Sequence, residues 1–308
     1  MHAQRLPSSA LISVELAMSF PTRPSAKSYM NNATACIVVP CFNEARRLNP
    51  ESLLTFALEH RNVHFVMVDD GSTDSTAEIL SELQSLFPES FEFLTLADNS
   101  GKAEAVRQGL LHAIGGGAEF VGYWDADLAT PLSTICEFHQ VLMKNDAIDV
   151  VLGCRIQGPG HDIRRPLIRA TLGRLFARAA SFVLRMHLFD TQCGAKLFRV
   201  TEDLKVAIQD PFTSRWIFDV ELLARLSKYR SSRAALFDAI YQMPLRRWHE
   251  QAGSKLRPWH FVNAGIELST IYFNMHAPAA STNQNRREAL ELVMGTTNER
   301  AIDVSRAA

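Results

Sequence analysis

The sequence predicts an α/β fold in which a mostly parallel central sheet is flanked by helices. Short apolar runs rich in β-branched residues alternate with stretches of helical periodicity between residues 35 and 124. Such alternation is typical of βαβ units, whose strands run parallel. In addition, polar clusters directly follow three of the apolar runs. Because ligands of parallel sheets bind at the carboxyl ends of the strands, we expect one functional crevice at that edge.

Local patterns predict the individual elements. The first run, Ala35-Cys-Ile-Val-Val-Pro40, is short, apolar and β-branched, as in a strand that is buried on both faces. Three further runs share this character, and the segments between them have the 3.6-residue periodicity of helices. We therefore predict strands at 35–40, 64–69, 91–96 and 120–124, and helices at 50–59, 75–87 and 102–114.

Composition limits the class of protein. With 308 residues, 47 % of them hydrophobic, and a net charge of −1, the chain can bury a large core and has no overall field that would attract nucleic acid. The longest apolar runs are too short for a membrane-spanning helix. The five cysteines include no CxxC pair, so we expect reduced, buried thiols in a cytoplasmic protein. Residues 1–33, rich in Ser, Pro, Ala and Asn, are expected to form a mobile leader.

The most specific motif is Asp125-Ala126-Asp127, directly after the fourth predicted strand. In an extended segment both carboxylates point to the same side, because side chains alternate along a strand. Carboxylates at this spacing suit Mg²⁺ or Mn²⁺ that also binds substrate phosphates. A solvated loop is the alternative, and Trp124 just before the motif makes that alternative less favoured.

Two further clusters suggest binding of a nucleotide. In Asp69-Asp70-Gly71-Ser72 the polar groups can cap the next helix, but two adjacent carboxylates exceed what a cap requires and could accept hydrogen bonds from a nucleobase. Lys102 opens the third predicted helix, where the helix dipole favours an acid. A phosphate near that helix terminus would explain the lysine, and a solvated side chain is the alternative.

Residues 164–187 are predicted to form a basic amphipathic helix. Arg174, Arg178 and Arg185 lie beside an apolar stripe with helical spacing. Such a helix can lie in a membrane interface and attract anionic headgroups, whereas a core-facing helix with a solvated arginine flank is the alternative. The predicted stripe consists of Ile168, Leu172, Leu175, Phe176, Ala179, Phe182, Val183 and Met186.

Charged residues also cluster in the second half of the chain. Asp219 and Glu221 follow Trp216, and they are either carboxylates presented to a site or ordinary charges on an amphipathic helix that begins near Phe218. His249 is favoured as a surface or packed histidine over a catalytic base.

Taken together, these motifs resemble family 2 glycosyltransferases of the GT-A fold. Four segments occur in the order and at the spacing of that family, namely 40–44, 68–76, 101–109 and 125–131. Segments in the second half are most similar to the dolichyl- and polyprenyl-phosphate β-glucosyltransferases and their mannosyl relatives; they are 153–155, 190–198, 216–223 and 253–256.

The resemblance implies how the chain is divided. A single GT-A domain with an amphipathic interface helix would occupy residues 34–260. Its nucleotide-binding half would be 34–131 and its acceptor half 132–260, followed by a C-terminal helix and polar tail at 261–308.

The resemblance also implies a role for each matching position. Asp125 and Asp127 would bind Mg²⁺ or Mn²⁺ that bridges the diphosphate of the nucleotide. The nucleotide sugar would be bound by Pro40, Asn43, Glu44, Asp69, Asp70, Lys102, Asp125, Ala126 and Asp127. The acceptor phosphate would be bound by Arg155, Lys196, Arg247 and Lys255, and the catalytic residues would be Asp127, Asp219, Arg155 and Lys196.

The implied reaction is inverting transfer of a sugar, with glucose from UDP-glucose favoured, to a polyprenyl or dolichyl phosphate. A phosphate acceptor is already anionic and needs no strong base, whereas a hydroxyl acceptor would require Asp219 or Glu221 to take its proton. The alternatives are a glycan or small-molecule hydroxyl acceptor and a non-catalytic module that binds nucleotide sugars. A nucleotidyltransferase is disfavoured, because no glycine-rich loop with Lys or Arg follows the first strand.

Many relatives in this family carry hydrophobic membrane anchors. Here the apolar segment at 261–275 is too short to span a bilayer, and residues 276–308 are polar. We therefore expect a cytoplasmic protein that contacts the cytoplasmic face of a membrane peripherally, through the helix at 164–187. A homo-oligomer is left open.

Overall fold

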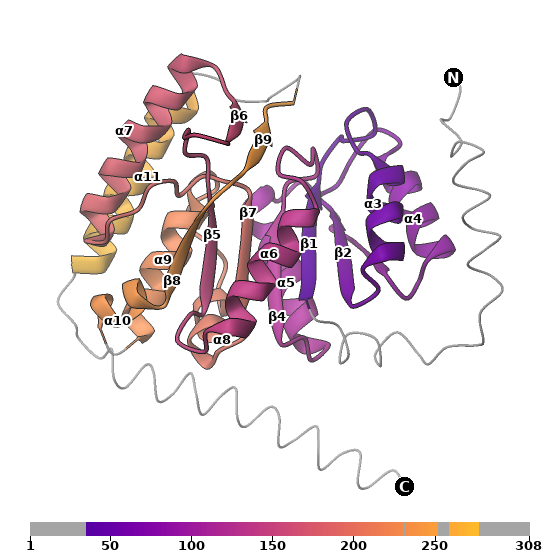
Figure 1. Cartoon of the computed structure of the whole chain (residues 1–308), viewed down its shortest axis with the longest axis horizontal. Helices are drawn as coiled ribbons and strands as arrows, with labels where there is room; N and C mark the ends of the chain where they lie inside the picture. The colour runs from indigo at the N-terminus through magenta and orange to yellow at the C-terminus, as the bar shows by residue number, and fades with distance from the viewer. Residues whose placement is uncertain (1–34, 231, 252–258, 277–308) are drawn as a thin grey trace, which may run out of the picture.

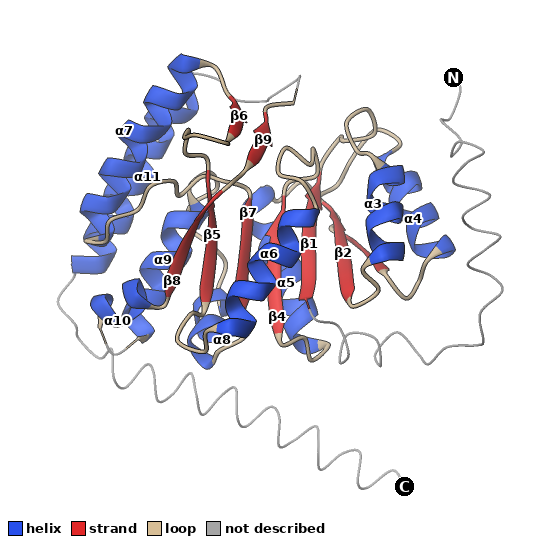
Figure 2. Cartoon of the chain, viewed as in Figure 1, coloured by secondary structure: helices blue, strands red, loops and turns tan. Residues whose placement is uncertain are grey.

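A seven-stranded sheet with helices on both faces forms the body of the molecule (Figures 1 and 2). The computed structural model describes residues 35–230, 232–251 and 259–276. The strands follow the order β3-β2-β1-β4-β7-β5-β8. They are β1 (Ala35–Cys41), β2 (Val63–Asp69), β3 (Phe91–Thr95), β4 (Phe120–Trp124), β5 (Val150–Cys154), β7 (Ala195–Arg199) and β8 (Ile240–Pro244).

The helices lie between the strands in sequence, as the alternating pattern predicts. Beside the main sheet, β6 (Asp162–Arg164) and β9 (Arg247–His249) pair as a separate ribbon. The helices are α3 (Pro50–Glu59), α4 (Thr76–Leu86), α5 (Lys102–Gly115), α6 (Ser133–Lys144), α7 (Leu167–Leu184), α8 (Glu202–Gln209), α9 (Phe218–Tyr229), α10 (Arg233–Asp238) and α11 (Trp259–His276).

The predicted α/β class with a mostly parallel sheet is confirmed. All neighbouring strands run parallel except β7, which is antiparallel to both β4 and β5. The chain builds β2 and β3 on one side of β1 and then places β4 on the other side. Such a reversal opens a crevice at the carboxyl ends of β1 and β4, where ligands of open α/β sheets bind.

The sheet is buried on both faces. In β1, Cys36 and Val38 pack in the core that contains α5, α8 and α9, whereas Ile37 and Val39 pack in the core that contains α3, α4 and α6. A strand covered on both faces requires an uninterrupted apolar run, which is why the sequence of β1 lacks polar alternation. All five cysteines are free thiols, and four of them are buried.

The predicted apolar stripe is divided between the core and the surface: Val183 and Met186 are buried, whereas Ile168, Leu175 and Phe182 are exposed. The buried face uses the small residues Ala177 and Ala180 together with Val183, because small side chains let α7 approach α9 and α11 closely. Large apolar side chains of α7 remain exposed as a result; they are Leu167, Ile168, Leu175 and Phe182.

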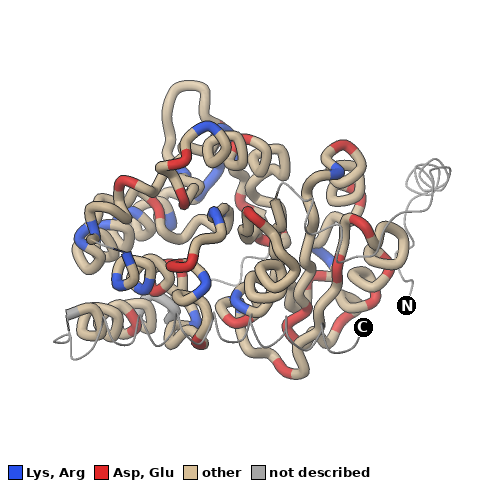
Figure 3. The backbone as a smooth tube through the Cα atoms, turned by 90° about the horizontal axis from the view of Figure 1, so that it is seen from below, with Lys and Arg blue, Asp and Glu red and all other residues tan. Residues whose placement is uncertain are grey.

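The helix expected near the carboxyl end of the chain is present as α11, which packs beside α7 (Figure 1). Within the ranges that the structure describes, no helix combines the length and apolar character that crossing a membrane requires. Charge is unevenly distributed: Lys and Arg are more frequent on the side of α7 to α10, and Asp and Glu on the side of α3 and α4 (Figure 3). The net charge of −1 is therefore the sum of a more basic and a more acidic region.

A glycine at the centre of α5 permits its close packing on the sheet. A Cβ atom at Gly109 would lie 2.4 Å from Val38 Cγ1 and 3.0 Å from Val68 Cγ2. We predict that Gly109→Ala lowers the free energy of unfolding by about 1–3 kcal/mol, because the added methyl overpacks a rigid β-branched core. Urea denaturation measures this loss.

Gly115→Ala is the matched control in the same helix. Nothing lies within 4 Å of a Cβ atom at that position, so alanine should raise stability by up to about 1 kcal/mol through helix propensity alone. Equal stability of the two variants would contradict close packing at Gly109.

Candidate active site

A cavity of about 710 Å³ lies at the carboxyl ends of β1 and β4, where the sheet reverses direction. Its wall extends from the two carboxylates after β4 to the amino-terminal part of α7. The predicted catalytic or metal-binding side chains that line it are Asp125, Asp127, Arg155 and Asp219.

Contacts with neighbouring segments position the two carboxylates after β4. The backbone N–H of Asp125 donates to the Gly194 carbonyl at 2.9 Å, and Lys102 Nζ lies 2.5 Å from Asp125 Oδ1. The Ala129 N–H donates to Asp127 Oδ1 at 3.1 Å. A Cβ atom at Gly194 would lie only 1.8 Å from Asp125 Oδ2, so this position requires glycine.

The Asp125–Asp127 pair suits a divalent cation whose remaining coordination positions are filled by substrate oxygens. Burial, followed by the negative charge of Asp125, raises the pKa of Asp127. A cation between the carboxylates would relieve this repulsion. The described residues contain no group of three or more His, Cys, Asp or Glu side chains that could hold a metal by themselves. Oxygen donors of this kind and number fit Mg²⁺ or Mn²⁺ bound together with phosphates.

The predicted nucleotide-binding residues divide into two groups. Asn43 Oδ1 accepts from the Thr73 N–H at 2.8 Å, and Asp69 Oδ1 accepts from the Ser72 N–H at 3.1 Å. Neither side chain lines the cavity, so both support the loops behind it. The residues that do line the cavity are Pro40, Glu44, Asp70, Lys102, Asp125, Ala126 and Asp127.

Asp70 shapes the loop that leads into α5. Its two carboxylate oxygens accept from the Ser100 N–H at 2.7 Å and the Gly101 N–H at 2.8 Å. Gly101 has φ 92°, a conformation that favours glycine, and it turns the chain into α5 so that Lys102 faces Asp125. Arg215 Nη2 lies 3.5 Å from the Ser100 carbonyl. Two cations therefore border the start of α5.

Lys196 and Asp219 form a buried ion pair in which Asp219 lines the cavity and Lys196 lies behind it. Lys196 Nζ lies 2.6 Å from Asp219 Oδ1 and donates to the Cys193 carbonyl at 2.6 Å, and the Tyr123 hydroxyl also donates to Asp219. Lys196 is 1 % exposed and does not line the cavity. We therefore revise its expected role from binding the acceptor phosphate to orienting the Asp219 carboxylate.

Three arginines, Arg155, Arg165 and Arg169, line the opposite end of the cavity from Asp125 and Asp127. Arg155 makes a two-pronged ion pair with Asp190, with Nε–Oδ2 and Nη2–Oδ1 distances of 2.7 and 2.8 Å. Although burial opposes it, the Arg155 charge lowers the pKa of Asp190 to about 2. Arg169 pairs with Glu250, whereas Arg165 has no ion pair among the described residues. Burial, followed by the charge of Arg155, lowers the pKa of Arg165 to about 10.

The remaining predicted acceptor residues are Arg247 and Lys255. Arg247 is exposed on β9 and does not line the cavity, and Lys255 lies outside the described residues. Arg165 and Arg169 also belong to the cavity wall, although the amphipathic pattern of residues 164–187 does not by itself indicate this. Their spacing to Gly173 and Phe176, which also line the cavity, is that of one helical face and could have separated them from the exposed arginines.

The fold and the site together define the class of protein. A sequence model described as Glycosyl transferase family 2 matches residues 36–204. The chain belongs to this family and is a glycosyltransferase, which confirms the resemblance seen in the motifs.

Particular relatives are dolichyl-phosphate beta-glucosyltransferases. One from Trichomonas vaginalis is 32 % identical over 250 residues, covering 76 % of this chain and 71 % of the relative. One from Saccharomyces cerevisiae is 32 % identical, and the match covers 71 % of this chain and 68 % of the relative. One from Homo sapiens is 29 % identical, and the match covers 82 % of this chain and 78 % of the relative.

Solved structures of low sequence identity share the fold. Glucosyl-3-phosphoglycerate synthase from Mycobacterium tuberculosis in complex with uridine-diphosphate has a TM-score of 0.54 at 17 % identity, covering 82 % of this chain and 86 % of that one. A complex of the same enzyme with Mn²⁺, UDP-glucose and phosphoglyceric acid has a TM-score of 0.53 and also 17 % identity.

The buried Lys196–Asp219 pair leads to a stability prediction. Lys196→Met should lower the free energy of unfolding by about 3–5 kcal/mol, because it leaves Asp219 charged in the interior without its cation. Adding Asp219→Asn should recover at least half of the loss. Urea denaturation measures both variants.

Lys205→Met is the matched control, since Lys205 forms an exposed ion pair with Glu202 at 2.6 Å. Its loss should remain under about 1 kcal/mol. If Lys196→Met were as stable as Lys205→Met, the buried pair would not hold this part of the structure.

Proposed function

We propose that this chain transfers glucose from UDP-glucose to a polyprenyl phosphate, with inversion at the sugar. The observation that carries the proposal is that one cavity joins Asp125 and Asp127 at one end to Arg155 and Arg165 at the other. The first pair suits a metal-bound diphosphate, and the arginines suit a second phosphate. The names of the dolichyl-phosphate relatives support the acceptor, and the UDP-glucose complex of a structural relative supports the donor.

The two halves of the chain would bind different substrates. We propose that residues 34–131 bind the nucleotide, because Asp70, Lys102 and Asp125 come from that half. Residues 132–260 would bind the acceptor, because Arg155 and Arg165 come from that half. The hydrogen bond from the Tyr123 hydroxyl to Asp219 would connect the two halves.

Charge neutralisation at the leaving group is the main catalytic contribution in this proposal. Mg²⁺ or Mn²⁺, held by Asp125 and Asp127, would supply electrostatic stabilisation of the departing diphosphate. Lys102, at the start of α5, adds positive charge on the same side of the cavity, and Arg215 beside it would contribute to binding of the donor diphosphate. Fixed cations of this kind stabilise negative charge that develops in the transition state.

The acceptor needs no strong base when its attacking oxygen belongs to a phosphate. Arg165, which lacks an ion pair among the described residues, would bind that phosphate with Arg155 and Arg169. The arginines would hold the oxygen in line with the sugar carbon that is attacked. Asp219 already accepts from Lys196 and Tyr123, so this arrangement does not favour it as a base for a hydroxyl acceptor.

Transfer of labelled glucose tests the proposal. Purified protein is incubated with radiolabelled UDP-glucose, UDP-GlcNAc or GDP-mannose, with Mn²⁺ or Mg²⁺ and a polyprenyl phosphate, and the product is extracted into organic solvent. Label from UDP-glucose should enter the solvent phase. Label that stays with a water-soluble product would favour a hydroxyl acceptor, and the absence of both transfer and hydrolysis would contradict a catalytic role.

Two substitutions connect this activity to the metal site. We expect Asp127→Asn and Gly194→Ala each to lower kcat/KM at least about 100-fold, since one removes a ligand and the other displaces Asp125. Gly158→Ala is the control, because nothing lies within 4 Å of a Cβ atom there. Full activity of Gly194→Ala would argue against a role for the Asp125 carboxylate.

We also propose that α7 brings the protein to a membrane surface. Its exposed apolar side chains, Ile168, Leu175 and Phe182, recur every seven residues and are 77 %, 62 % and 75 % exposed. Arg174 and Arg178 are exposed beside them. The aromatic ring of Phe182 also stacks on Tyr272 of α11, at 6.4 Å between ring centroids. Apolar and basic residues on one face suit a surface of anionic lipid.

Flotation with vesicles of phosphatidylcholine and phosphatidylglycerol tests the membrane contact. Reversing Arg174 and Arg178 to Glu should weaken binding at least about 30-fold, because each arginine near an anionic surface contributes about 1 kcal/mol. Reversing Arg46 and Lys144, which lie outside α7, serves as the control. No flotation of the unaltered protein, or equal loss in both double variants, would contradict the proposal.

A further inference from the structure

The segment 213–217 forms one wall of the cavity without regular structure of its own. Arg215, Trp216 and Ile217 line the cavity, and Arg215 reaches the loop before α5. The Nε atom of Arg215 lies 3.6 Å from the position of a Cβ atom at Gly101. The charge of Arg215 also acts on Asp70 and opposes the rise in that carboxyl's pKa that burial causes. The position of this segment therefore determines how close the Arg215 charge lies to Asp70 and to the loop before α5.

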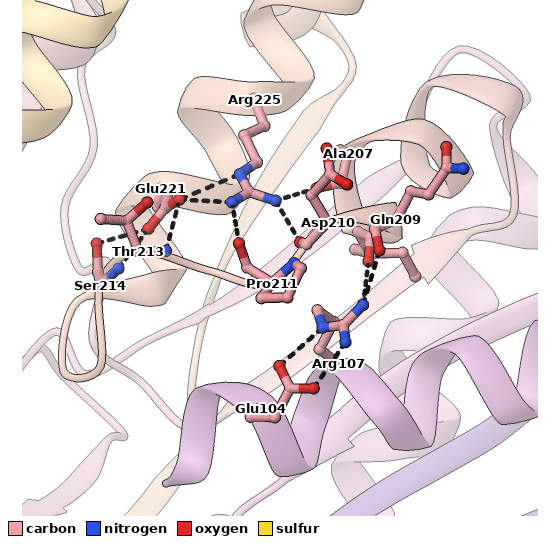
Figure 4. A network of polar contacts seen from close by, with 11 residues as sticks. Glu104, Arg107, Ala207, Gln209, Asp210, Pro211, Thr213, Ser214, Glu221 and Arg225 are labelled. Carbon is pink, nitrogen blue, oxygen red and sulfur yellow. Dashed lines mark hydrogen bonds and ion pairs between the residues drawn. The ribbon is translucent and has the colours of Figure 1, made fainter. Parts of the chain in front are cut away.

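The chain before the segment is held by arginines (Figure 4). Arg107 of α5 donates to the Gln209 carbonyl at 2.8 Å. Arg225 of α9 donates to the Asp210 carbonyl at 2.7 Å and the Pro211 carbonyl at 2.6 Å. These bonds satisfy the carbonyl groups that follow α8, where the helix no longer provides partners.

Glu221 holds the beginning of the segment. Its carboxylate accepts from the Thr213 N–H at 3.1 Å and from the Ser214 N–H and hydroxyl at 2.7 Å each (Figure 4). Although burial opposes it, these donors lower the pKa of Glu221. Glu221 does not line the cavity. Glu221 therefore supports the backbone of the segment, and it does not act as the base that a hydroxyl acceptor would require.

The end of the segment is held from a distant part of the chain. Ile217 is the N-cap residue of α9, and its apolar side chain cannot accept a hydrogen bond from the first turn. Glu267 of α11 supplies a carboxylate to the two residues that directly precede this turn. Its Oε2 atom accepts from the Trp216 N–H at 3.3 Å and from the Ile217 N–H at 3.1 Å. A negative charge at this point also suits the helix dipole of α9.

We propose that Glu267 is a positioning residue, which orders the segment 213–217 and thereby places Arg215 and Trp216 in the wall of the cavity. The inference rests on the proposed function for its effect on the donor, because Arg215 borders the expected diphosphate site. It assigns a role in donor binding to α11, which lies outside the residues matched by the family model. Glu267 touches neither substrate nor metal in this account and acts only through the segment.

Three variants test the proposal. Glu267→Ala removes the acceptor, Glu267→Gln retains an amide oxygen that can still accept, and Ser269→Ala is the control. The Ser269 hydroxyl is exposed and donates only within α11, to the Gly265 carbonyl at 2.9 Å. Hydrogen exchange of the amides of 213–217 is measured by mass spectrometry, and kcat and KM for UDP-glucose are measured separately.

We expect exchange of these amides to be about tenfold faster in Glu267→Ala, because a hydrogen bond to a charged acceptor is lost. KM for UDP-glucose should rise about tenfold while kcat changes by less than about threefold, since the loss falls on donor binding. Glu267→Gln should restore both quantities to within about threefold of the unaltered protein. Ser269→Ala should match the unaltered protein in both.

Unchanged exchange in Glu267→Ala would overturn the proposal, as would faster exchange with an unchanged KM. If Glu267→Ala fails to fold, the same comparison is made with Glu267→Asp, whose shorter side chain withdraws the carboxylate from the Trp216 and Ile217 N–H groups; unaltered exchange and an unaltered KM in that variant count against the role. The exchange measurement requires no turnover. A protein that transfers no glucose but shows the expected exchange would contradict the proposed function and leave the positioning of the segment supported.

Discussion

The buried ion pair between Lys196 and Asp219 is the contact on which the site depends most. Lys196 lies on β7, which is antiparallel to both of its neighbouring strands, and Asp219 lies in the first turn of α9. The pair connects the centre of the sheet to the helix that closes the cavity. Because a buried charge without its partner is costly, β7 and α9 cannot shift independently. Directly before β7, Gly194 leaves room for the Asp125 carboxylate, so the residue that leads into this strand also positions one predicted metal ligand.

Carboxylates support the walls of the cavity as much as they line it. Asp70, Asp190 and Glu221 each accept hydrogen bonds from backbone N–H groups of a segment that has no regular structure. Glu267 does the same for the start of α9. Acidic residues therefore serve two purposes in this fold: some face the space where ligands bind, and others hold the backbone that surrounds it. The two groups are distinguished only by the residues that they contact in the folded structure.

Helix α7 links the cavity to the surface of the molecule. Arg169 of α7 lines the cavity together with Arg165, which precedes the helix, whereas Arg174 and Arg178 lie on the exposed side beside Leu175. One helix thus presents cations in two directions, which a single amphipathic stripe does not describe. This arrangement suits an enzyme whose acceptor would have a phosphate in the cavity and an apolar chain outside it.

The sequence by itself determined the class of fold, most of the strands and helices in the first half, and the family. Those predictions depend on local features: apolar runs of strand length, helical periodicity, and polar clusters such as Asp125 to Asp127 at strand ends. Only the tertiary structure decided which charged residues face the cavity. Lys196 and Arg165 are both cations in the second half, yet Lys196 is paired in the interior and Arg165 faces the cavity. The physical reason is that a charge takes its role from the partners that packing brings near it, and those partners lie far away in sequence.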